Sequence, residues 1–152
     1  MPIVNSRVHI TVKIWHPELV NIYDSTIGEG TKIADFVEIG GSHIGKNCKI
    51  EAHTFIPPGT TIGDYVFIGP NCTVCNDKYP NAMANSWERS PVTVKDRARV
   101  GAGAVILPGV TVGENSTVGA GSVVAENVPD GEIWYGEKAK QREIKCLNQS
   151  PM

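Results

Sequence analysis

Histidine is the side chain that most often changes charge near neutral pH, and the sequence holds four of them. We expect His53, in the segment AHTFI, at a chemical site, since a general base contributes roughly 10²–10⁴-fold in rate. The polar segment CNDKYPNAMANSWERSP adds Asn76, which could hold a hydroxyl or orient His53, and Asp77, which could receive an ammonium group or take its proton. We therefore expect His53, Asn76 and Asp77 to be the catalytic residues.

The same polar segment offers side chains suited to holding a substrate. Lys78, Tyr79 and Trp87 lie within it, Asn71 shortly precedes it, and we expect all four to bind substrate. Loops carry binding residues more often than the scaffold does. Trp87 could stack on a ligand or cover a seam between subunits.

No metal site is expected. Cys72 and Cys75 form a C-x-x-C pair, but no second pair of ligands follows at zinc-binding spacing. We expect packing thiols instead.

An internal repeat of six residues predicts the fold. A period of six fits neither a helix nor an alternating strand, but it fits a coil with three flat sides and eighteen residues per turn. Fifteen aliphatic positions give five coils, and Val8, Ile14 and Val20 suggest one looser coil before them. The prediction is an all-β parallel β-helix of about five to six coils. The positions are Ile27, Ile33, Ile39, Ile44, Ile50, Ile56, Ile62, Ile68, Val74, Val94, Val100, Ile106, Val112, Val118 and Val124.

Two near-identical stretches, VGAGAVI and VGAGSVV, place glycines on neighbouring coils. Gly101 and Gly119 follow aliphatic residues and could simply turn corners. Gly103 and Gly121 are expected within a side, where they would leave a bare groove for a thin ligand such as the pantetheine arm of coenzyme A. The predicted outward column reads His53, Asn71, Gly103, Gly121.

The repeat is interrupted between Val74 and Val94, which predicts a loop insertion over residues 75–91. We expect a β-helix domain over residues 1–126. Residues 127–152 leave the pattern and are expected to form a C-terminal tail, in which REIKCL could be a short helix.

Hexads such as IGDYVF and VGENST resemble those of the hexapeptide-repeat acyltransferases, over roughly residues 8–140. That resemblance implies a left-handed β-helix, against the usual right-handed crossover rule. TVCNDKYP, the downstream SPVTVKDRARVGAGAVILPGVTVG and the early KIWH look like the nucleotide-sugar 3-N-acetyltransferases, which act on dTDP- or UDP-linked 3-amino sugars. Those relatives carry about one more coil between the histidine and the loop. Their Gly-x-Pro-Ala-Lys tail appears here as GEKAK, with Lys138 in place of proline.

The resemblance implies transfer of an acetyl group from acetyl-CoA to a sugar amine, in the synthesis of cell-surface polysaccharide such as lipopolysaccharide. His53 and the Asn76–Asp77 pair match the relatives' site positions. The resemblance also implies a homotrimer with active sites at the subunit seams and acetyl-CoA lying along the coils. The expected CoA-binding residues are Gly101, Ala102, Gly103, Gly119, Ala120, Gly121, Lys138 and Lys140.

Two other interpretations remain open. The acceptor could be a sugar or serine hydroxyl, or the chain could be a non-catalytic β-helix that serves as a scaffold or binding protein. The net charge of −2 argues against a nucleic-acid partner, and no apolar run is long enough to span a membrane. The N-terminal residues lack a long apolar region typical of a signal peptide, so we expect a cytoplasmic location.

Overall fold

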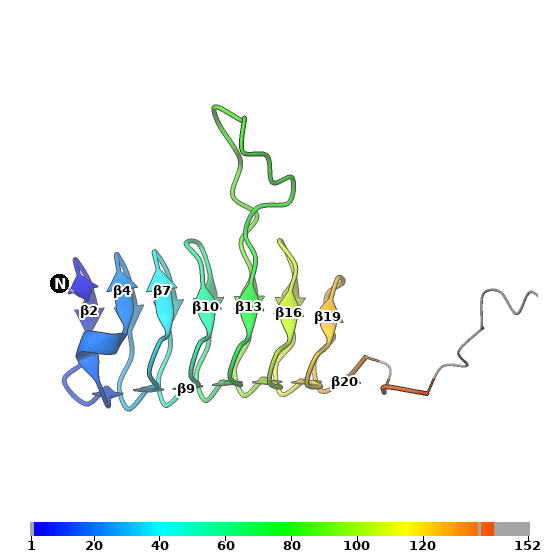
Figure 1. Ribbon diagram of the computed structural model, residues 1–152. Coiled ribbons are helices and arrows are strands. Elements are labelled where there is room, and N and C mark those ends of the chain that lie inside the picture. Colours follow the sequence, from blue (N-terminus) through cyan, green and yellow to red (C-terminus); the bar gives the residue numbers. More distant parts are fainter. Residues whose placement is uncertain (1, 137, 142–152) are drawn as a thin grey trace, which may run out of the picture.

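The computed structural model describes residues 2–136 and 138–141, and most of them form a solenoid with three flat sides (Figure 1). Each side is a parallel sheet of strands two or three residues long. Sheet A contains β1 (Ile3–Val4), β4 (Asn21–Tyr23), β7 (Glu38–Gly40), β10 (Phe55–Ile56), β13 (Thr73–Val74), β16 (Val105–Ile106) and β19 (Val123–Val124).

The other two sheets follow in the same order along each coil. Sheet B contains β2 (Arg7–Val8), β5 (Thr26–Ile27), β8 (His43–Ile44), β11 (Thr61–Ile62), β14 (Thr93–Val94) and β17 (Thr111–Val112). Sheet C contains β3 (Lys13–Ile14), β6 (Lys32–Ile33), β9 (Lys49–Ile50), β12 (Phe67–Ile68), β15 (Arg99–Val100), β18 (Thr117–Val118) and β20 (Ile133–Trp134). We call the turns between them the A–B, B–C and C–A corners.

The all-β solenoid is confirmed, but the expected five to six coils were too few. Sheets A and C each have seven strands, so the chain makes about seven turns. The strand at Ile3 was missed, and in the looser first coil expected at Val8, Ile14 and Val20 the residue that pairs in sheet A is Ile22 and not Val20, because the spacing there is irregular. The helix η1 (Pro17–Leu19) takes up the extra residues after Ile14.

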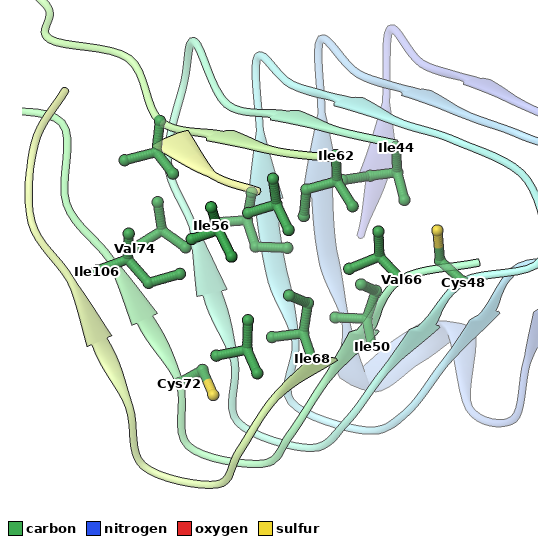
Figure 2. Close-up of a cluster of buried hydrophobic side chains, with 14 of the residues drawn as sticks. Ile44, Cys48, Ile50, Ile56, Ile62, Val66, Ile68, Cys72, Val74 and Ile106 are labelled. Atoms are coloured by element: carbon green, nitrogen blue, oxygen red, sulfur yellow. The ribbon is translucent and has the colours of Figure 1, made fainter. Parts of the chain in front are cut away.

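The fifteen aliphatic residues of the repeat are all buried and stack turn upon turn to form the core, part of which is shown in Figure 2. Full burial of each such side chain contributes about 1.5–3 kcal/mol. Small residues two positions earlier share the interior, and their polar atoms are satisfied: the Thr31 hydroxyl donates to the carbonyl of Gly45 at 2.8 Å. Cys48 and Cys72 belong to this set, and burial raises the pKa of both thiols. They are packing residues.

The short five-residue steps and the long insertion fall at the A–B corner. The five-residue step from Ile39 to Ile44 recurs between Ile22 and Ile27, and the long insertion leaves from the same corner. The insertion projects away from the solenoid between β13 and β14 (Figure 1). A bridge between Asp77 and Arg89 closes its base.

The solenoid continues beyond the expected domain boundary at residue 126. Strand β20 pairs with β18, and Val128 is buried beside Val112. Residues 127–130 break the six-residue pattern, and the final strand resumes it. The segment REIKCL lies outside the described residues. Within the described part of the chain, no helix is long and apolar enough to cross a membrane.

Candidate active site

The C–A corner carries a continuous column of five residues. All five have left-handed backbone conformations, and each donates its N–H to a carbonyl of the preceding turn, as Gly103 does to Pro70 at 2.8 Å. The column is Phe36, His53, Asn71, Gly103 and Gly121. The order His53, Asn71, Gly103, Gly121 along this corner agrees with the eighteen-residue stacking expected from the sequence.

The corner is turned by a different pair of glycines from the pair expected. Gly101 and Gly119 are needed because neighbouring turns come close: a Cβ on Gly101 would lie 2.5 Å from the backbone nitrogen of Ala120. Gly103 and Gly121 are the residues that turn the corner, with φ of 69° and 70°. Nothing lies within 4 Å of a Cβ placed on either. His53 has the same backbone conformation and carries a side chain, so the corner does not require glycine. The glycines at positions 103 and 121 therefore leave the surface bare.

His53 stands on this corner against an aromatic neighbour from the preceding turn. Its ring stacks on that of Phe36, with centroids 4.8 Å apart and an angle of 21° between the planes. Beside Phe36, Asp35 accepts a hydrogen bond from Nδ1 of His16 at 2.8 Å. The Asp35 carboxylate raises the pKa of His16, first through this hydrogen bond and then through its charge.

The loop brings together four of the residues expected there. Asp77, Lys78, Tyr79 and Trp87 line one pocket of about 710 Å³. An Asp77 carboxylate oxygen accepts the N–H of Tyr79 at 3.1 Å, which fixes the turn that begins the loop. Asn76 instead points back to the solenoid, where its side-chain amide donates to the carbonyl of Pro58 at 3.0 Å.

Within one chain, His53 and the Asn76–Asp77 pair lie at the two different corners that flank the strands of sheet A. His53 precedes β10 at the C–A corner, whereas Asn76 packs on Pro58 at the A–B corner. The backbone from His53 to Pro58 spans at most about 16 Å at about 3.3 Å per residue, and its two ends lie at different corners of the solenoid. The structure therefore does not bring the three expected catalytic residues together in a single chain.

Two of the remaining expected CoA-binding residues lie at this corner. Ala102 and Ala120 are exposed between the stacked glycines. Lys138 and Lys140 lie beyond β20 and are exposed. No cluster of three metal-ligating side chains occurs among the described residues.

Sequence reasoning missed Phe36, Asp35 and His16 as neighbours of His53. The five-residue step from Ile39 to Ile44 shortens one coil, so Phe36 lies seventeen residues before His53 instead of eighteen. Allowing for that step would have placed Phe36 in the column.

The repeat matches the family described as bacterial transferase hexapeptide (six repeats), over residues 24–57, 41–76 and 91–126. The matches cover more than half of the chain, so the protein belongs to this family, and the expected left-handed parallel β-helix is confirmed.

Its relatives include enzymes that act on amino sugars. GDP-perosamine N-acetyltransferase of Escherichia coli O157:H7 is 36% identical over 103 residues, which are 66% of this chain and 39% of that protein. The chain thus spans well under half of that curated relative.

Two solved structures extend the similarity. PerB from Caulobacter crescentus, in complex with CoA and GDP-perosamine, matches with a TM-score of 0.61 and 25% identity, over 88% of this chain and 54% of that one. A variant of AntD, an N-acyltransferase from Bacillus cereus, in complex with dTDP-4-amino-4,6-dideoxyglucose and CoA, has a TM-score of 0.68 and 26% identity, over 91% and 82%.

Proposed function

We propose that the protein transfers the acetyl group of acetyl-CoA to the amine of a nucleotide-linked amino sugar for cell-surface polysaccharide synthesis. The observation that carries the proposal is the C–A corner, where an open, bare surface at Gly103 and Gly121 lies in line with His53. Backbone amides exposed there can pair with the amides of pantetheine. The relatives' complexes with CoA and amino sugars support the same assignment.

The reaction needs a neutral amine, an oxyanion site and alignment. The amine nitrogen attacks the thioester carbonyl, a new C–N bond forms, and the C–S bond breaks to release the CoA thiolate. His53 accepts the proton that the amine loses, and Asp77 holds the ammonium form before attack. The oxyanion is stabilised by N–H groups at this corner other than those of Gly103 and Gly121, which already donate to the preceding turn. Alignment of the two substrates can contribute on the order of 7–11 kcal/mol.

The acceptor's identity is the finer part of the proposal. The resemblance in the loop favours a dTDP- or UDP-linked 3-amino sugar. The relatives add GDP as a nucleotide and position 4 as a place for the amine. Asn71, Lys78, Tyr79 and Trp87 are the proposed acceptor-binding residues.

A homotrimer with active sites at its seams completes the site. His53 and Asp77 lie at the two different corners that flank the strands of sheet A. In the proposed trimer, His53 of one chain and Asp77 of a second chain come together. The outward residues on the C-terminal half of sheet A include the apolar Phe55, Val105 and Val123, of which Val123 is 65% exposed, together with the polar Thr73. A second copy covering this face would bury that apolar surface. In that assembly the loop of one chain reaches the C–A corner of the next.

A hydroxyl acceptor is the second candidate, because the same corner also suits O-acetylation. A hydroxyl is a weaker nucleophile than an amine and depends more strongly on a base. A non-catalytic β-helix would release no thiol and bind no CoA.

The test is thiol release from acetyl-CoA with GDP-, dTDP- and UDP-linked 3- and 4-amino sugars, comparing the wild type with His53→Ala and Asp77→Ala. Turnover that falls at least tenfold in Asp77→Ala supports the N-acetyltransferase. If acetyl-CoA binds but no amine is acylated, the hydroxyl acceptor is supported instead. Absence of CoA binding would exclude both enzymes.

A further inference from the structure

A row of lysines crosses the N-terminal half of sheet C. Lys13, Lys32 and Lys49 occupy the same outward position on the adjacent strands β3, β6 and β9. Adjacent strands lie about 4.8 Å apart, and like charges directly opposite one another destabilise a sheet. None of the three forms an ion pair with a carboxylate in residues 2–136 or 138–141. A row of unneutralised cations is suited to an anionic ligand.

The lysine row borders a pocket of about 410 Å³ at the C–A corner. Trp15, Lys32, Ala34, Lys49, Ile50 and Glu51 line it. The ring of Trp15 is 50% exposed, and the ammonium group of Lys13 lies 4.5 Å from its centroid. An exposed indole beside two free ammonium groups provides one surface for a flat aromatic ring and another for phosphates.

This pocket adjoins His53 on the side opposite the glycines. Lys49 belongs to the same turn as His53, and Trp15 lies two turns toward the N-terminus, about 10 Å along the axis at about 4.8 Å per turn. Gly103 and Gly121 extend from His53 in the other direction. The corner thus has a cationic, aromatic half and a bare half, with His53 between them.

We propose that Lys32 and Lys49 bind the diphosphate of the nucleotide-linked acceptor and that Trp15 stacks on its base. This assignment rests on the proposed function. The amino sugar then lies at His53, and CoA approaches over Gly103 and Gly121. Glu51, which lines the same pocket, accepts hydrogen bonds from the ribose hydroxyls through its carboxylate. The two substrates enter from opposite ends of one corner and meet at His53.

The first test is direct binding of GDP, dTDP and UDP to the intact protein by calorimetry, without acetyl-CoA. The wild type should bind at least one of them, more weakly at high salt because the contacts are ionic. Lys32→Gln/Lys49→Gln should weaken binding at least tenfold, and Trp15→Leu at least threefold. Lys95→Gln, an exposed lysine on the B–C corner, is the matched control and should leave binding unchanged. Pyrophosphate alone should compete in the wild type.

The second test separates this diphosphate from that of CoA, which carries the same chemistry. With an acceptor that turns over, the double lysine variant should raise the KM for the acceptor at least tenfold and leave the KM for acetyl-CoA within twofold. A rise confined to the KM for acetyl-CoA would overturn the assignment and place CoA on the lysine row. Equal nucleotide binding by wild type and variant would overturn it as well, whether or not acetyl transfer is observed.

Discussion

Gly103 stacks directly on Asn71 at the C–A corner and shares its left-handed backbone conformation, with φ of 69° against 57°. Asparagine is the residue that most readily replaces glycine in this conformation. The corner can therefore be given side chains without being refolded. This makes the bare surface open to a direct test.

Replacing Gly103 or Gly121 with asparagine should raise the KM for acetyl-CoA at least tenfold. The new side chain meets no atom of the protein within 4 Å of its Cβ, so it projects into the space proposed for the pantetheine arm. The unfolding midpoint should change by less than a few degrees, because only a small change in backbone strain is involved. Steady-state kinetics with acetyl-CoA as the varied substrate and thermal unfolding measure the two effects.

Gly131→Asn is the matched control for these variants. Gly131 has φ of 73° and open space where a Cβ would lie, as at Gly103 and Gly121, but it is at the B–C corner. Its substitution should leave the KM for acetyl-CoA unchanged. If all three variants behave alike, the C–A corner has no special part in cofactor binding.

Gly101→Ala should destabilise the fold instead. Its Cβ would come within 2.5 Å of the Ala120 nitrogen and 2.9 Å of the Gly119 carbonyl carbon, which are backbone atoms of the next turn. Separating two turns costs about 1–3 kcal/mol, as in other overpacked cores. Chemical denaturation should show a lower midpoint for Gly101→Ala than for Gly103→Asn. Equal midpoints for the two variants would mean that the neighbouring turns of the solenoid can move apart at little cost in stability.

The solenoid could be predicted because its core position recurs every six residues, and one buried isoleucine or valine per side suffices to define a coil. What the period could not give was the first strand at Ile3 and the inward position of Ile22, because helix η1 and a five-residue step break the six-residue count there. The column from His53 to Gly121 followed from the same counting. The reason for each glycine did not, because crowding at Gly101 and φ at Gly103 depend on coordinates.

Phe36→Asn should separate activity from stability at His53. Phe36 has a left-handed φ of 63°, which is strained for an aromatic residue, and its ring is the one that stacks on His53. Asparagine relieves the strain but removes a stacked pair worth about 0.5–1.5 kcal/mol. We expect kcat to fall about two- to tenfold while the unfolding midpoint holds or rises. A fall in both would assign Phe36 a structural role only.

The His16–Asp35 pair should make stability depend on pH. Because Asp35 raises the pKa of His16 in the folded protein, the pair contributes fully below the ordinary pKa of about 6.5. That contribution is lost as the pH rises through the raised value. Asp35→Asn should lower the pKa of His16, measured by NMR titration of its ring protons. Glu18→Gln should lower it less, because Glu18 is the weaker influence. The reverse order would contradict the hydrogen-bonded pair.

Mixed oligomers test whether each site is shared between chains. His53→Ala and Asp77→Ala each remove one side of the proposed seam, so each pure oligomer should lose at least nine-tenths of its activity. The two variants are co-expressed with different tags, and oligomers that carry both tags are purified. In these mixed oligomers a fraction of the seams contains an intact His53 and an intact Asp77. In each such seam, His53 comes from one chain and Asp77 comes from its neighbour.

The activity that the mixed oligomers recover depends on the number of chains in the closed ring. In a closed trimer that holds both variants, about a third of the seams receive both intact residues, whichever variant is present twice. The mixture should therefore show about a third of wild-type kcat with an unchanged KM for the acceptor. If His53 and Asp77 instead worked within one chain, every chain in the mixture would still carry a lesion, and no activity would return. Within a single chain the two residues lie at different corners of the solenoid, which is the reason to expect recovery.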